Sequence, residues 1–234
     1  SVKHYEKVME IDPEFVNAHI QLSYIYIAMK KLDQAIAVLK KALTLEKRQA
    51  DVHLAMAFCY SEKGDKDAAV EEYKKGIEID PFNPKAYFYL GAALEEMGHK
   101  EESIIKLRRS IELDPQDPEA LNYLGYIYAD DNRNLDEAEA LIKKALELNP
   151  GNGAYIDSLG WVYFKKGMLE DARKELEKAQ ETIGEDPVVY DHLGDVYFKT
   201  GMLDKAKEAW TKSIGLKEDK KVKEKLNAIP KNLQ

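Results

Sequence analysis

A repeated pattern constrains the fold of this chain more than any other feature of its sequence. Residues 159–172 read LGWVYFKKGMLEDA and residues 193–206 read LGDVYFKTGMLDKA, so ten of fourteen positions agree at a separation of 34 residues. Small residues recur at intervals of 34 or 35 residues, at Ser23, Ala57, Gly91, Gly125, Gly160 and Gly194. Periods of about 20–50 residues are typical of tandem supersecondary units. We therefore expect a repeat protein.

Each period has the pattern of a helix, a turn and a second helix. Leu159 and Tyr163 are four residues apart and share one helical face, beside the small Gly160. Gly167 follows where a helix end favours a left-handed residue, and Ala172 lies in the next helical run. Single helices of about 12–14 residues are marginal in water. The two helices of a period are therefore expected to pack together, with Gly160 and Ala172 at a close contact.

This alternation closely resembles the tetratricopeptide (TPR) repeat, at Leu159, Gly160, Tyr163, Gly167, Ala172, Leu176 and Ala179. The resemblance implies an all-α fold, a TPR-type right-handed α-solenoid of antiparallel helix pairs that runs as a single superhelix over residues 1–234. Residues 1–15 are expected to be a partial repeat and residues 218–229 a capping helix. Six full repeats are expected at residues 16–49, 50–83, 84–117, 118–152, 153–186 and 187–220.

The resemblance also implies that the first helices of the repeats line a concave groove. Four aromatic residues share one register position there, which predicts a contiguous apolar stripe: Tyr24, Phe58, Tyr126 and Trp161. Large exposed apolar patches mark contact sites, and aromatic anchors dominate binding. Packing between crowded inner helices is the alternative for this set, and it is the favoured interpretation for Phe88, Phe164 and Phe198. The candidate peptide-binding residues are Tyr24, Phe58, Phe88, Tyr89, Asn122, Tyr123, Tyr126, Asp157, Trp161 and Phe164.

Capture of a peptide's terminal carboxylate is not expected. Chaperone-binding members of the family hold that group with lysine, asparagine and arginine side chains on three repeats. The matching positions here are Ile20, Tyr24, Ala55, Lys85 and Tyr89, of which only Lys85 is suitable. Asn122 can still bind the backbone of an extended peptide, because its side chain both donates and accepts hydrogen bonds.

Other kinds of function find little support in the sequence. The formal net charge of −8 argues against a general attraction to nucleic acid or anionic lipid. No apolar run approaches the roughly 20 residues that a membrane-spanning helix needs. The five histidines have no metal-ligand spacing, and Leu141 stands where a calcium loop starting at Asp130 needs its glutamate. We expect no enzyme activity, no metal and no cofactor.

The leading hypothesis is a scaffold or adaptor that binds an apolar or aromatic peptide segment, or a partner helix, in the groove. The alternative is a structural module that oligomerises by end-to-end stacking of repeats. An apolar face at the N-terminus, formed by Tyr5, Val8 and Ile11, could support self-association.

Residues 121–210 are further similar to exported TPR lipoproteins of the Gram-negative envelope, some of which present substrates to periplasmic proteases. The one-residue-longer turn in ADDNRNLDEA and the run DSLGW carry this similarity. It implies a bacterial adaptor in the periplasm, anchored to the outer membrane in a full-length form, with a cytoplasmic location as the alternative. The chain begins in mid-pattern, which predicts that it is part of a longer protein.

Overall fold

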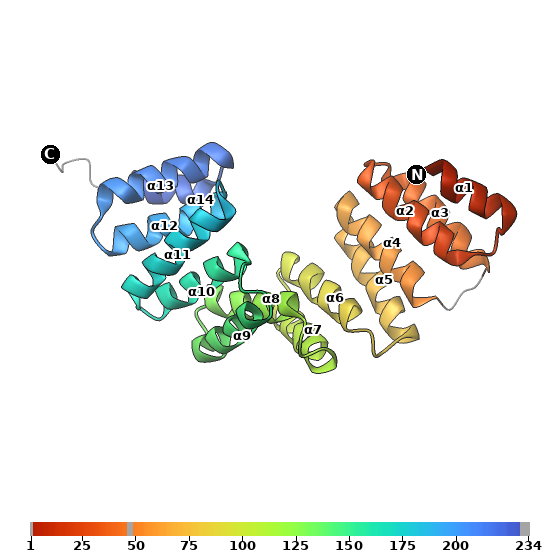
Figure 1. Ribbon diagram of the computed structural model, residues 1–234, viewed down its shortest axis with the longest axis horizontal. Helices are drawn as coiled ribbons and strands as arrows, with labels where there is room; N and C mark the ends of the chain where they lie inside the picture. The colour runs from red at the N-terminus through yellow and green to blue at the C-terminus, as the bar shows by residue number, and fades with distance from the viewer. Residues whose placement is uncertain (1, 46–48, 230–234) are drawn as a thin grey trace. The chain divides into compact units, whose positions relative to one another are not determined.

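The computed structural model describes residues 2–45 and 49–229. Helices α1 to α14 make up the regular structure of these residues, so the predicted all-α repeat fold is confirmed. The helices fall into two compact units, Ser1–Pro115 and Gln116–Gln234. Figure 1 shows helix hairpins stacked side by side within each unit. That all six hairpins continue as one superhelix stays a prediction.

The N-terminal unit holds one single helix and three hairpins. The single helix is α1 (Val2–Ile11), which packs on α2 and corresponds to the predicted partial repeat. The hairpins are α2 (Val16–Ala28) with α3 (Leu32–Leu45), α4 (Ala50–Lys63) with α5 (Lys66–Ile79), and α6 (Pro84–Glu96) with α7 (Lys100–Leu113).

The C-terminal unit holds three more hairpins and an end helix. Its hairpins are α8 (Pro118–Asp130) with α9 (Leu135–Leu148), α10 (Gly153–Lys165) with α11 (Leu169–Ile183), and α12 (Pro187–Lys199) with α13 (Leu203–Leu216). The end helix is α14 (Lys220–Asn227), at the position predicted for a capping helix.

The turns inside the hairpins have the backbone conformation that the sequence predicts. Gly167, between α10 and α11, has a φ of +77°, which an L side chain rarely adopts. The longer turn between α8 and α9 has no glycine, and Asn132 and Asn134 take positive φ values of 53° and 48° instead. Asparagine tolerates this region better than most residues, because its short polar side chain can bond locally. The extra residue of the fourth repeat is therefore absorbed in its turn.

The two helices of a hairpin approach each other closely at the small positions. A Cβ added to Gly160 would lie 2.7 Å from Leu176 Cγ and 3.2 Å from the Leu176 backbone nitrogen. Ala172 and Leu176 are fully buried in this contact. The predicted close contact between Gly160 and the second helix is therefore present, and it leaves no room for a side chain.

Cys59, the single cysteine of the sequence, is fully buried on α4. It belongs to a core cluster with Val52, Ala55 and Met56. Burial raises the pKa of its thiol to about 11. The thiol therefore packs as a small apolar group and remains protonated at neutral pH.

The end helix α14 closes the C-terminal unit with one apolar and one ionic contact. Val222 packs against Ala206 and Trp210. Lys225 Nζ lies 2.8 Å from a carboxylate oxygen of Asp191 and 2.8 Å from one of Asp195, both on α12. The helix thus covers the apolar side of the last hairpin and binds two carboxylates that point to the same side.

Candidate functional site

A hollow of about 400 Å³ in the N-terminal unit lies where the sequence predicts a groove. We call it the N-terminal groove. Its apolar lining consists of Ile20, Tyr24, Leu54, Phe58, Tyr73 and Tyr89. Its polar lining consists of Asn17, Gln21, Asp51, Asn83 and Lys85.

The repeat register explains how these side chains meet. Tyr24 on α2 and Phe58 on α4 are 34 residues apart, so they take the same place on neighbouring first helices. Asn17, Asp51 and Lys85 are related by the same interval and occupy the first turns of α2, α4 and α6. The groove therefore has a polar row at one end of the first helices and an aromatic row nearer their middle.

Three aromatic rings of the groove are accessible, and one of them has a rigid backing. Tyr24, Phe58 and Tyr89 are 43%, 37% and 39% exposed, respectively. The Tyr89 ring stacks on the buried Tyr73 ring, with centroids 6.1 Å apart and planes 18° apart. Phe88 contacts the Tyr89 ring edge-on at 5.2 Å and is itself half-buried. The groove thus presents ring surface that the protein does not cover.

Two tyrosines of the groove, Tyr24 and Tyr73, are held in their neutral form. Burial raises the pKa of Tyr73 to about 12. The pKa of Tyr24 is also raised, first by burial and then by the negative charge of Asp51. Both hydroxyls therefore remain protonated at neutral pH and can donate as well as accept hydrogen bonds.

In the C-terminal unit the aromatic side chain at the same register position is covered. Trp161 is 7% exposed, so its predicted place in an exposed stripe is wrong. Its ring stacks on His192 at a centroid distance of 4.0 Å and on Phe164 at 5.0 Å. Lys165 Nζ lies 4.6 Å from the ring centroid. The packing alternative therefore describes Trp161, because a side chain of the next first helix lies across its face.

Asp157, another predicted groove residue, is also buried, with 6% exposure. His192 Nδ1 lies 3.0 Å from each of its carboxylate oxygens. Removal from water by itself lowers the pKa of His192, but the charge of Asp157, with Asp191 and Asp195 nearby, raises it above its ordinary value. Asp157 therefore holds His192 against Trp161 and is not open to a ligand.

The remaining candidates of the C-terminal unit are half-buried on α8. They are Asn122, Tyr123 and Tyr126. The Tyr126 ring centroid lies 6.4 Å from that of His192. The ten predicted residues thus separate into four in the N-terminal unit and six in the C-terminal unit. Of the four, Tyr24, Phe58 and Tyr89 line the N-terminal groove, whereas Phe88 lies against Tyr89 and does not line it.

Asp51, Asn83 and Tyr73 line the N-terminal groove but are not among the predicted candidate residues. Asp51 could have been predicted from the sequence, because it lies 34 residues from both Asn17 and Lys85 and so shares their place in the repeat. Asn83 precedes α6 and accepts a hydrogen bond from the Ala86 amide, so it reads as a helix cap. Tyr73 lies on the second helix α5, at a position whose equivalents are packing residues, and no sequence signal shows that its ring reaches the groove.

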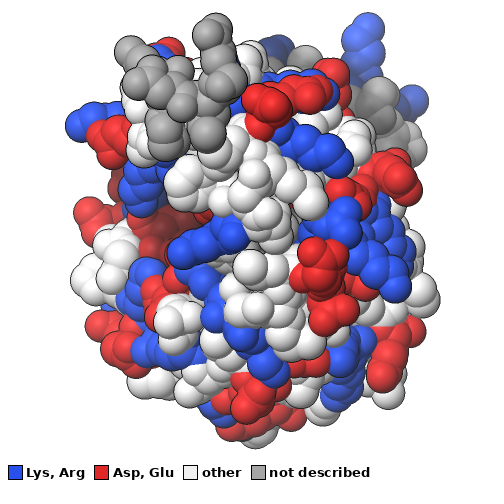
Figure 2. Space-filling view, turned by 90° about the vertical axis from the view of Figure 1, so that its left-hand side faces the viewer, with Lys and Arg blue, Asp and Glu red and all other residues white. Residues whose placement is uncertain are grey.

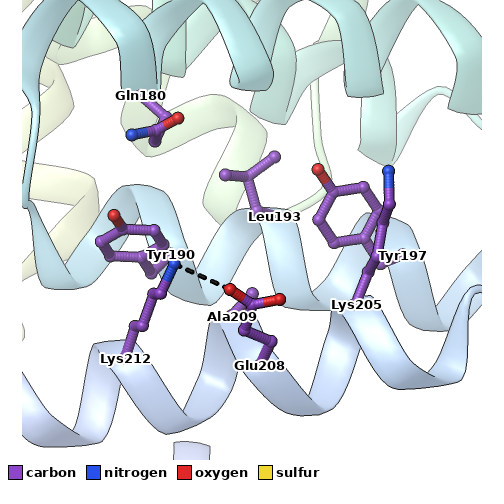
Figure 3. Close-up of a pocket in the computed structure, with 8 residues that line it drawn as sticks. All are labelled: Gln180, Tyr190, Leu193, Tyr197, Lys205, Glu208, Ala209 and Lys212. Atoms are coloured by element: carbon purple, nitrogen blue, oxygen red, sulfur yellow. Dashed lines mark ion pairs between the residues drawn. The ribbon is translucent and has the colours of Figure 1, made fainter.

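A second, smaller hollow of about 190 Å³ lies between α11, α12 and α13. Figure 3 shows Tyr190 and Tyr197 on either side of Leu193, with an ion pair of 2.8 Å between Lys212 and Glu208 on α13. Figure 2 shows basic and acidic side chains interspersed over the face on the left of Figure 1. This face therefore has no broad region of a single charge among the residues described.

Two further properties concern the described residues as a whole. Within residues 2–45 and 49–229, no set of three or more histidine, cysteine or acidic side chains is placed to hold a metal ion. Over the same residues, no helix is long and apolar enough to span a membrane.

Comparison with known proteins gives a family and a fold. The TPR repeat-containing protein PA4667 of Pseudomonas aeruginosa is 43% identical over 54 residues, which are 23% of this chain and 9% of that protein. The match thus spans less than a tenth of that relative. The crystal structure of the APC/C hetero-tetramer Cut9–Hcn1 aligns with a TM-score of 0.83 at 20% identity, over 95% of this chain and 44% of that one. PilW aligns with a TM-score of 0.78 at 19% identity, over 90% of this chain and 98% of that one.

These structures share the fold of helix hairpins that both units show. The model of the family described as "Cilia and flagella-associated protein 70 C-terminal domain" matches residues 5–229, which is nearly the whole chain. The chain therefore belongs to this family of TPR proteins.

Proposed function

We propose that this chain is a protein-interaction scaffold, and not an enzyme, whose N-terminal groove binds an apolar or aromatic segment of a partner protein. The observation that carries the proposal is the set of three accessible rings, Tyr24, Phe58 and Tyr89, around a hollow of about 400 Å³. Accessible aromatic clusters with polar edges are the usual anchors of protein interfaces.

The size of the groove is adequate for this role. Burying a large apolar side chain contributes about 1.5–3 kcal/mol. Three such contacts, less the cost of ordering a flexible segment, correspond to a dissociation constant in roughly the micromolar range. The stacking of Tyr89 on Tyr73 fixes one anchor before binding, which lowers that ordering cost. The relative Cut9–Hcn1, described as a hetero-tetramer, lends support because there the same fold occurs in an assembly with another protein.

The experiment that tests the proposal is a peptide-array screen with the whole chain, followed by titration of the selected peptides. The double variant Phe58→Ala with Tyr89→Ala should weaken binding at least about tenfold, because it removes two anchors of the groove. Ile105→Ala is the matched control, since Ile105 is an apolar residue 62% exposed on the second helix α7. Equal binding by wild type and double variant would overturn the proposal.

A structural role by stacking of repeats is the second candidate. The observation that favours it is α1, which has no fully buried residue and whose Ile11 is 77% exposed. If this face joins copies of the chain, Ile11→Glu should reduce the mass measured by light scattering and leave peptide binding unchanged. A monomeric wild-type chain at the same concentration would exclude this candidate.

The bacterial envelope setting is the finer part of the proposal. It is supported by the similarity to PilW, described as a type IV pilus biogenesis factor, and by the match to a Pseudomonas aeruginosa protein. An adaptor in this setting would present a bound segment to a protease or an assembly complex. Fractionation of cells that produce the native protein tests it, and recovery in the cytoplasmic fraction alone would contradict it.

A further inference from the structure

The N-terminal groove contains two opposite charges that form no ion pair within residues 2–45 and 49–229. Asp51 and Lys85 occupy the first turns of α4 and α6, and both are exposed. Neither forms an ion pair with the other or with any other described residue. The negative charge of Asp51 contributes to the raised pKa of Tyr24, so this carboxylate lies close to the aromatic row.

Elsewhere in the same unit, exposed charges on neighbouring hairpins are paired. Lys30 Nζ lies 2.8 Å from Glu62, and Lys63 Nζ lies 2.6 Å from Asp33. Both pairs lie near the opposite end of the first helices, and each connects residues 30 or more positions apart. The stack therefore brings cross-hairpin charges together at one end, whereas Asp51 and Lys85 remain available at the groove end.

On the basis of the proposed function, we infer that the occupant of the groove is an extended segment with a basic and an acidic residue on either side of its apolar anchor. The basic side chain pairs with Asp51 and the acidic one with Lys85. The anchor enters among Tyr24, Phe58 and Tyr89, and the amides of Asn17 and Gln21 can bond the segment's backbone.

The arrangement of the helices also sets the shortest spacing of the two charges in the segment. Packed helices are separated by roughly 8–10 Å. An extended chain rises about 3.3 Å per residue, and a polyproline II chain rises about 3.1 Å with three residues per turn. Since α4 and α6 both pack on α5 and make little contact with each other, a segment that crosses from α4 to α6 needs at least about three residues. In the polyproline II form, residues three apart also point to the same side, so the shortest pattern that fits is a basic and an acidic residue at positions i and i+3. The direction of the segment sets which of the two comes first.

Three synthetic peptides with blocked ends test this inference on the whole chain. All three have a phenylalanine between the two variable positions, which are Arg then Glu in the first peptide, Glu then Arg in the second and Gln in both places in the third. One charged peptide should bind the wild type roughly three- to tenfold more tightly than the Gln peptide, as expected for two exposed ion pairs. This advantage should shrink as salt is added.

Variants of the chain connect that preference to the two residues. Asp51→Asn with Lys85→Gln should remove the preference, and Asp51→Lys with Lys85→Glu should transfer it to the peptide of opposite order. The matched control is Asp67→Asn with Lys40→Gln, which removes one exposed charge of each sign outside the groove and should change nothing.

The outcomes separate this inference from the proposed function. If all three peptides bind equally and Phe58→Ala weakens them, the groove function stands and the charge inference is overturned. If a preference exists but survives the Asp51 and Lys85 changes, the inference is likewise overturned. If no peptide binds, both the inference and the proposed groove function fail.

Discussion

The two units place an aromatic side chain at the same register position and use it in opposite ways. Phe58 in the N-terminal unit is 37% exposed, whereas Trp161 in the C-terminal unit is 7% exposed. The difference arises 31 residues later, on the next first helix. The residue 31 positions after Trp161 is His192, which stacks on the Trp161 ring. The residue 31 positions after Phe58 is Tyr89, which stacks on Tyr73 and leaves Phe58 exposed. Whether the aromatic ring at this position is exposed or covered thus depends on where the side chain 31 residues later is held.

His192 and Tyr89 are held by side chains from different helices of the preceding repeat. Asp157 holds His192 from the preceding first helix, so the histidine is drawn across the inner face. Tyr73 holds Tyr89 from a second helix, so the tyrosine stands beside the groove and lines it. For Tyr24 the equivalent neighbour is Ala55, which is too small to cover a ring. One repeat scaffold therefore carries both an open groove and a filled one.

The largest expected effect concerns the two rings themselves. Trp161→Ala removes a buried ring and should lower the free energy of unfolding by about 3–5 kcal/mol, as large-to-small core changes do. Phe58→Ala removes a ring that is already partly in water and should cost less than half as much. Chemical denaturation followed by circular dichroism measures both. Similar losses for the two variants would break the comparison between the units.

The next effect should be equal in the two units. Gly91→Val and Gly160→Val each introduce a side chain against the facing leucine. A Cβ added at Gly91 would lie 2.8 Å from Leu107 Cγ, and one added at Gly160 would lie 2.7 Å from Leu176 Cγ. Overpacking of this kind costs about 1–3 kcal/mol. The same denaturation experiment should give matching losses, since the hairpin contact is shared and only the groove differs. A large loss of unfolding free energy for one variant alone would show that the two units also differ in the packing of their hairpins.

A pH effect should distinguish the filled groove. The pKa of His192 in the folded chain is above its unfolded value of about 6.5, since Asp157 outweighs the effect of burial. A raised pKa stabilises the folded state fully below the unfolded pKa, and this contribution disappears as the pH rises through the folded pKa. Stability should therefore fall as the pH rises from about 6.5 through the folded pKa of His192.

The control for the pH effect is His192→Gln, which has no titrating group at this position. Its stability should lack the fall over the same interval, although its overall stability is lower. An unchanged pH profile in this variant would show that the fall has another origin.

The smallest effect on stability should come from Tyr24→Ala. This ring is 43% exposed and has no covering neighbour, so the unfolding free energy should change by less than about 1 kcal/mol. Binding of a groove peptide should nevertheless weaken about fivefold or more, because an anchor is lost. A small change in stability together with a clear loss of binding would show that Tyr24 contacts the ligand and contributes little to packing. The opposite result would assign Tyr24 to packing.

The fold could be predicted from the sequence because its determinants are local and repeated. Gly160 and Gly167 mark a close contact and a turn whose residue types follow from sterics alone, and the 34-residue period multiplies each such signal. The end helix α14 was predictable for a similar reason, since Val222 and Leu226 form one apolar face in a polar segment.

The candidate site could be predicted only in part. The register placed Tyr24 and Phe58 beside one hollow, because residues at equal positions align on neighbouring helices, and it placed Tyr89 on the inner side of the next first helix. It could not show that Trp161 is covered, since that depends on an ion pair between Asp157 and His192 on different helices. It also could not show that Tyr73 reaches the groove from a second helix. Side-chain reach and pairing between repeats are properties of the packed structure.

The buried Cys59 has a practical consequence for experiments on the groove. Its thiol stays protonated and covered, so alkylating reagents at neutral pH should leave it unmodified. A fluorescent dye attached to a cysteine introduced at Gln21, on the rim of the hollow, would then be the single label on the chain. Its emission would report directly whether the groove is occupied, without first replacing the native thiol.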